Sequence, residues 1–93
     1  MKFKDKVVLV TGGGTGLGRA MGLQFAREGA AVIVNYSKSK EHAKEVVDRI
    51  NAEGGQAADI QADVARDQQA RQLIEKTVAR FGRLDILINN AGW

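Results

Sequence analysis

The sequence contains no cysteine and no proline, and its aromatic residues are one tryptophan, one tyrosine and three phenylalanines. Without cysteine the chain builds neither a disulfide framework nor a thiolate metal site, and we expect no metal and a cytoplasmic location. The sequence also lacks a long apolar run, so we expect no transmembrane span, no signal peptide and no membrane partner.

Charge of one sign does not dominate either. Lysine and arginine number 14 and aspartate and glutamate 11, which leaves a formal net charge of +3. The basic residues are scattered among acidic ones on segments with helical periodicity, a pattern typical of solvated helix faces. We therefore expect no nucleic-acid partner.

The rest of the chain is organised around the stretch from Val7 to Gly22. Four apolar residues predict a buried strand, a glycine cluster ends it, and helix-period apolar residues follow. Gly12, Gly16 and Gly18 let the chain turn sharply and approach a ligand closely, and a helix that begins near Gly16 directs unpaired N–H groups at it. We expect the pyrophosphate of a nucleotide there, although such turns also serve close packing of a helix on a strand.

A P-loop is excluded because no Lys-Ser or Lys-Thr pair follows the glycines. Nothing would then reach the β- and γ-phosphates of a triphosphate or hold its magnesium ion.

The remaining segments alternate between strand and helix patterns. Strands are predicted at Lys6 to Val10, Ala30 to Asn35, Gln56 to Gln61 and Leu84 to Ile88, and helices at Gly16 to Glu28, from a Ser37 or Ser39 cap to Ala52, and from about Asp67 to Phe81. The first helix is expected to bury Leu17, Ala20, Met21, Leu23, Phe25 or Gln24, and Ala26, and the third Ala70, Leu73, Ile74, Thr77, Val78 and Phe81. The order βαβαβαβ predicts an α/β fold, a Rossmann-type doubly wound parallel sheet with strand order 3-2-1-4, incomplete in these residues.

Polar residues follow each predicted strand. In chain order they are the glycine loop, Asn35 to Lys38, Asp63 with Val64, and Asn89 to Gly92. In a doubly wound sheet all of these meet at the carboxyl ends of the strands, where ligands bind.

Three of these motifs, Thr11 to Gly18, Asp63-Val64 and Asn89-Asn90-Ala91-Gly92, resemble the amino-terminal half of the short-chain dehydrogenases/reductases over essentially all 93 residues. The resemblance implies a Rossmann fold that binds NAD(H) or NADP(H), with hydride transfer between nicotinamide and a carbonyl or alcohol. It implies that the glycine loop cradles the adenosine ribose and pyrophosphate and that Asp63 accepts from the adenine amino group while the Val64 backbone contacts the ring. It also implies that Asn90, Ala91 and Gly92 line the adenosine-side ribose and the sheet centre. The expected cofactor-binding residues are Gly12, Gly14, Thr15, Gly16, Leu17, Gly18, Asn35, Tyr36, Ser37, Lys38, Asp63, Val64, Asn90, Ala91 and Gly92.

Several of these polar residues also have a purely structural interpretation. Asp63 can cap the following helix or bond a turn amide, and Asn89 and Asn90 can stabilise a turn. His42, the only histidine, lies on the polar side of the second predicted helix, where we expect no catalytic or ligand role.

Cofactor choice depends on the end of the second strand. An NAD site usually places an acidic residue roughly 20 residues past the glycines, to bond the ribose 2′-hydroxyl. This chain has Asn35, Tyr36, Ser37 and Lys38 instead, so we expect NADP as the preferred cofactor, with NAD as the alternative.

Catalysis in the family requires a serine and a Tyr-x-x-x-Lys pair on a later helix, and we identify no catalytic residue here. Tyr36 and Lys40 match that spacing but lie on the adenosine side, so we reject the match. We expect residues 1–93 to be the NAD(P)-binding half-domain of a longer enzyme, inactive alone, whose complete parent is a homo-oligomer. The alternatives are a non-catalytic nucleotide-binding module or another Rossmann enzyme such as a methyltransferase.

The topology supports an incomplete domain independently. The third helix alone would cover the second face of the sheet, so Leu84 to Ile88 would form an apolar strand with one unpaired edge. We expect these residues in isolation to fold poorly or to self-associate.

Overall fold

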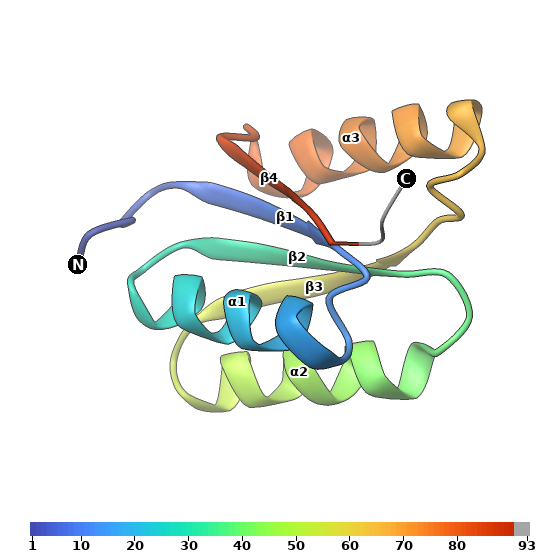
Figure 1. Ribbon diagram of the computed structural model, residues 1–93. Helices are drawn as coiled ribbons and strands as arrows, with labels where there is room; N and C mark the ends of the chain where they lie inside the picture. Colours follow the sequence, from blue (N-terminus) through green and yellow to red (C-terminus); the bar gives the residue numbers. More distant parts are fainter. Residues whose placement is uncertain (91–93) are drawn as a thin grey trace.

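A computed structural model describes residues 1–90 and shows strands alternating with helices throughout that range (Figure 1). The elements are β1 (Val7–Thr11), α1 (Gly16–Arg27), β2 (Ala31–Tyr36), α2 (Lys40–Ala52), β3 (Gln56–Gln61), α3 (Asp67–Phe81) and β4 (Ile86–Asn89). The expected βαβαβαβ order is therefore confirmed, including β3, whose bounds are those predicted.

The strands form one parallel sheet in the order β3-β2-β1-β4, as the sequence predicts. Figure 1 shows α1 and α2 on one face and α3 on the other, which is the arrangement that right-handed crossovers produce. The chain therefore reverses its winding between β1 and β4, and their carboxyl ends border the place where such sheets bind ligands.

The core lies mainly between the sheet and α1 with α2. On the sheet side its centre is formed by Val8, Val10, Val32 and Val34, all fully buried, and α2 contributes Ala43, Val46, Val47 and Ile50. The second face has a smaller cluster, in which Leu9 and Ile33 pack with Leu73 of α3.

The predicted buried face of α1 is wrong in part. Leu17 is 68% exposed, and Ala20 and Gln24 are exposed as well, whereas Gly18, Gly22 and Leu23 are buried. The face that packs on the sheet consists largely of glycines, which allow the helix to lie close to β1 and β2. The predicted Leu23, Phe25 and Ala26 do pack on the core. Because glycine carries no apolar side chain, a search for apolar periodicity misses Gly18 and Gly22 and includes Leu17 and Ala20 instead.

Three strands lie slightly farther along the chain than predicted. β1 and β2 each begin and end one residue later, and β4 begins and ends later than the predicted Leu84 to Ile88. Pairing explains the shift, since Thr11 pairs with Asn89 and Tyr36 with Gln61, and a parallel ladder continues through polar residues when a neighbour is present. α1 ends at Arg27, one residue before the predicted Glu28, and Gly29 follows with a φ of +99°.

The α3 side is only partly covered. Thr77 and Leu73 are buried as predicted, but Ile74 and Val78 are 42% and 41% exposed, and Leu87 of β4 is 44% exposed. Within residues 1–90, β4 pairs only with β1, so its other edge carries no neighbour. In that same range, no helix is long and apolar enough to cross a membrane.

Candidate functional site

The carboxyl ends of the four parallel strands lie at one edge of the sheet, where β1 turns into α1 (Figure 1). The glycine turn follows β1, Asn35 to Lys38 follow or end β2, and Asp63 lies two residues beyond β3. Asn90 follows β4 directly. The structure therefore brings together the groups that the sequence places at separate strand ends.

The glycine turn has the left-handed backbone that its residues predict. Gly12 has a φ of +61° and Gly16 a φ of +57°, values that residues with a Cβ rarely adopt. The turn is held against β2, because the N–H of Gly12 donates to Asn35 Oδ1 at 3.3 Å and the N–H of Gly13 donates to the Asn35 carbonyl at 3.0 Å. These two hydrogen bonds join the glycine turn to the neighbouring strand.

The start of α1 is suited to an anion. Thr15 is its N-cap residue but makes no side-chain cap hydrogen bond, and its first turn contains no acidic residue. The first N–H groups of the helix and the positive end of its dipole therefore face the turn without a side-chain acceptor. A phosphate placed there would accept from these groups.

Gly18 of α1 lies against the glycine turn and Asn90. A Cβ at this position would lie 2.5 Å from Asn90 Nδ2 and 2.5 Å from the Gly12 carbonyl oxygen. Asn90 Nδ2 itself donates to that carbonyl at 3.0 Å, which joins the end of β4 to the turn. Gly14 also has little free space around it, because a Cβ added there would lie 3.0 Å from the backbone nitrogen of Ala43 in the first turn of α2.

Thr11 is a structural part of the site that was not among the predicted cofactor-binding residues. Its side chain is fully buried, and Oγ1 accepts from the Asn90 N–H at 3.0 Å and lies 3.3 Å from the Ile88 carbonyl, to which it can donate. The sequence feature that could have identified Thr11 is its position, a hydroxyl residue at the end of an otherwise apolar strand. Together Thr11 and Asn90 connect β1, β4 and the glycine turn.

The end of β2 separates buried from exposed side chains. Asn35 is 2% exposed, and Tyr36 packs against the core on the α1 and α2 side. Ser37 and Lys38 are exposed, and the Ser37 carbonyl accepts from Gln61 Nε2 at 3.1 Å. This bond holds the loop after β2 beside the end of β3.

Asp63 adopts the turn role that the sequence leaves open. Its Oδ1 accepts from the Ala65 N–H at 3.1 Å, and its Oδ2 lies 3.5 Å from Arg66 Nε. The Asp63 N–H donates to Gln69 Oε1 at 2.7 Å, which fixes the segment against α3. The Asp63 side chain is nevertheless 43% exposed, so it remains accessible to a ligand. Val64 packs partly into the small core beneath α3.

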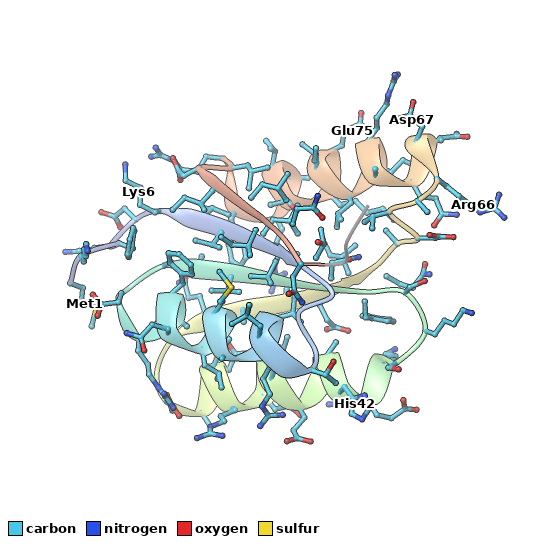
Figure 2. The ribbon with its side chains drawn as sticks, in the orientation of Figure 1. Met1, Lys6, His42, Arg66, Asp67 and Glu75 are labelled. Carbon is cyan, nitrogen blue, oxygen red and sulfur yellow. The ribbon has the colours of Figure 1, made fainter. Side chains whose placement is uncertain are left out.

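Ala91 and Gly92 lie outside the described residues. His42 is exposed on α2 beside the glycine turn, since a Cβ at Gly14 would lie 3.1 Å from His42 Cβ, and Figure 2 shows its side chain directed away from the sheet. Tyr36 ends β2 whereas Lys40 begins α2, so the two do not share a helix face. Among residues 1–90, no cluster of His, Cys, Asp and Glu is placed to hold a metal ion.

A hollow of about 550 Å³ lies at the opposite, amino edge of the sheet. Its charged lining includes Arg27 and Glu53, which pair with each other at 3.0 Å. The Arg27 guanidinium is also the main reason that the pKa of Glu53 lies below its ordinary value. Arg27 and Glu53 satisfy one another. The glycines that line this hollow, Gly29 and Gly54 with Gly55, follow the carboxyl ends of α1 and α2, where the helix dipole disfavours an anion, so we place the site at the carboxyl edge of the sheet.

Known proteins are similar to this chain in sequence and in fold. A model of the short chain dehydrogenase family matches residues 6–93. An uncharacterized oxidoreductase of Methylorubrum extorquens is 50% identical over 98% of this chain, which spans 37% of that protein. A short-chain dehydrogenase/reductase homolog of Bacillus subtilis is 47% identical over the same share, and this chain spans 84% of it.

Among solved structures, a short chain dehydrogenase from Burkholderia cenocepacia in complex with NADP superimposes with a TM-score of 0.95 at 43% identity. The match covers 100% of this chain and 38% of that one.

Proposed function

The chain belongs to the short-chain dehydrogenase family, and on that premise we propose that it binds the adenosine and pyrophosphate half of NADP(H) for an oxidoreductase. The observation that carries the proposal is the glycine turn, joined to β2 and β4 by hydrogen bonds, beneath the uncapped start of α1. Backbone N–H groups and the helix dipole there suit a pyrophosphate.

The preference for NADP over NAD rests on the end of β2. The four residues Asn35 to Lys38 include no carboxylate that would repel a 2′-phosphate, and Ser37 and Lys38 are exposed beside the site. A lysine and a hydroxyl can donate to that phosphate. The similar Burkholderia cenocepacia enzyme was solved with NADP.

The proposed reaction is hydride transfer between the nicotinamide and a carbonyl or alcohol substrate. The bound nicotinamide supplies or accepts the hydride, and the residues described here bind and orient the other half of the dinucleotide. The expected catalytic serine and Tyr-x-x-x-Lys pair would lie in a part of the parent protein beyond these 93 residues.

The test is calorimetric titration of the protein, expressed from its full reading frame, with NADPH and NADH. We expect saturable binding of both and a lower Kd for NADPH. Changing Lys38→Glu should raise the Kd for NADPH about tenfold, because a charge-assisted contact becomes a repulsion, and should raise that for NADH much less.

The control is Lys4→Glu, which makes the same charge change at the amino edge of the sheet and should leave both constants unchanged. Equal losses for the two cofactors in Lys38→Glu would reject the 2′-phosphate assignment. Absence of saturable binding by the unaltered protein would reject the function.

A second candidate is a nucleotide-binding module without catalytic groups. It is favoured by the Bacillus subtilis homolog, a protein of which this chain spans 84%. Both candidates require dinucleotide binding, so the discriminating measurement is NADPH oxidation with a panel of carbonyl compounds. Turnover supports the oxidoreductase, and tight binding without turnover supports the module.

A further inference from the structure

The side-chain amide of Asn35 lies where three strand ends meet. It is 2% exposed, and each of its polar atoms bonds to the backbone. Oδ1 accepts from the Gly12 N–H at 3.3 Å, while Nδ2 lies 3.2 Å from the Ile60 carbonyl and 3.3 Å from both the Ala62 and Tyr36 carbonyls. One side chain thus joins the turn after β1 to the end of β3.

The partners of this amide require both a donor and an acceptor. The group from the glycine turn is an N–H, and the groups at the end of β3 are the carbonyl oxygens of Ile60 and Ala62. A carboxylate would face those carbonyls with a negative charge, and an apolar side chain would leave buried backbone groups without partners. Asparagine satisfies both strands at once.

The two segments joined by Asn35 are the two that hold the adenosine half in the function proposed above. Gly12 opens the phosphate-binding turn, and Ala62 directly precedes Asp63. Main-chain bonds run alongside, since the Gly13 N–H donates to the Asn35 carbonyl and the Ala62 N–H donates to the Tyr36 carbonyl. The side chain of Asn35 adds the direct link from the turn to the end of β3.

We propose that Asn35 is a positioning residue that sets the spacing between the glycine turn and the Asp63 segment without itself contacting the dinucleotide. This differs from the role expected from the sequence, where Asn35 is grouped with the residues that touch the cofactor. Its burial and its backbone partners leave the contacts to Ser37, Lys38 and Asp63, which are more exposed. The inference rests on the proposed dinucleotide-binding function.

The test compares Asn35→Leu with Asn51→Leu, two neutral changes of similar size. Asn51 is the control. It is more exposed than Asn35, but its side-chain amide also bonds to both sides of the β3 backbone, donating to the Ala57 carbonyl at 3.3 Å and accepting from the Ala57 N–H at 3.0 Å. It does so at the start of β3, away from the cofactor edge. The protein from the full reading frame is titrated calorimetrically with NADPH and with adenosine 2′,5′-bisphosphate, which lacks the nicotinamide half.

We expect Asn35→Leu to raise the Kd of both ligands by a similar factor of about ten, the equivalent of one lost buried hydrogen bond. The stoichiometry of binding should stay near that of the unaltered protein, because loss of folded molecules lowers the number of sites whereas misplacement lowers their affinity. Asn51→Leu should lower the melting temperature with an unchanged Kd.

Three results would overturn the inference. They are an unchanged Kd in Asn35→Leu, a fall in stoichiometry alone, or an equal loss of affinity in Asn51→Leu. If Asn35→Leu does not fold, Asn35→Asp keeps the acceptor for Gly12 and is titrated at high salt, where repulsion of the phosphates is screened, with the same tenfold expectation. Failure of the unaltered protein to bind either ligand would instead reject the proposed function.

Discussion

At the scale of single residues, two glycines on the same face of α1 have different reasons to be glycine. Gly18 is in near contact with Asn90 and the Gly12 carbonyl, so a methyl group has no room there. At Gly22 an added Cβ would meet only Val32 Cγ1, at 3.7 Å, which is an ordinary packing distance. The absence of a side chain at Gly18 allows the contact with Asn90 and the glycine turn, whereas at Gly22 it mainly allows the helix to lie close to the sheet.

This contrast gives a prediction for Gly18→Ala and Gly22→Ala. Gly18→Ala should destabilise the fold by about 1–3 kcal/mol through overpacking, and should weaken NADPH binding by displacing Asn90 or the turn. Gly22→Ala should be neutral or stabilising by up to about 1 kcal/mol, since alanine favours a helix interior over glycine. Urea denaturation and cofactor titration of both variants check this, and similar behaviour of the two would contradict it.

At the scale of elements, the carboxylate of Asp85, the residue before β4, adds a side-chain bond to the backbone pairing of β4 with β1. Asp85 Oδ2 accepts from the Val7 N–H at 2.8 Å, and Oδ1 accepts from Arg83 Nη2 at 2.7 Å. The Arg83 guanidinium and then the Val7 N–H hold the pKa of Asp85 below its ordinary value. Because the folded pKa is depressed, this bond stabilises the fold above the unfolded pKa and is lost as the pH falls through the folded value.

We therefore predict that the stability gap between the unaltered protein and Asp85→Asn is full at neutral pH and closes as the pH falls below about 4. Asp48→Asn serves as the control, because Asp48 forms only an exposed helical ion pair with Lys44, which contributes roughly 0–1 kcal/mol. Urea denaturation across the acid range measures both gaps. A gap for Asp85→Asn that stays constant with pH would show that its ionisation does not stabilise the sheet.

At the scale of the whole molecule, the two faces of the sheet are unequally covered. The face beneath α1 and α2 has a continuous core, whereas Ile74, Val78 and Leu87 on the α3 side are each more than 40% exposed. The chain also spans about 37% of the Methylorubrum extorquens relative. An apolar surface beside an unpaired strand edge favours association of one copy with another when nothing else covers it.

We predict that the 93-residue chain on its own self-associates and that Leu87→Lys reduces this association. A lysine at an exposed edge disfavours strand pairing between copies. Sedimentation velocity over a concentration series measures the effect, with Lys76→Arg on the surface of α3 as a neutral control. A monodisperse monomer with a sharp cooperative melt in the unaltered chain would contradict the prediction.

The sequence by itself determined the order of the elements, the α/β class and the strand order. Val7 to Val10 and the glycines after them specify a strand, a turn and a helix locally, because β-branched side chains and missing Cβ atoms act through neighbouring residues. The alternation of strands and helices predicts a parallel sheet with right-handed crossovers. In such a sheet the carboxyl ends of the strands lie at one edge, so the polar residues that follow them come close together.

Only the tertiary structure decided which face of α1 is buried and what several site side chains bond to. Leu17 is exposed and Gly18 buried because packing against Asn90 and the turn determines the helix orientation, and this contact joins residues far apart in the chain. Asn35 likewise bonds to backbone atoms of β1's turn and of β3, partners that no local pattern reveals. Hydrogen bonds between strands depend on where the folded chain brings their ends, so they follow from the tertiary structure.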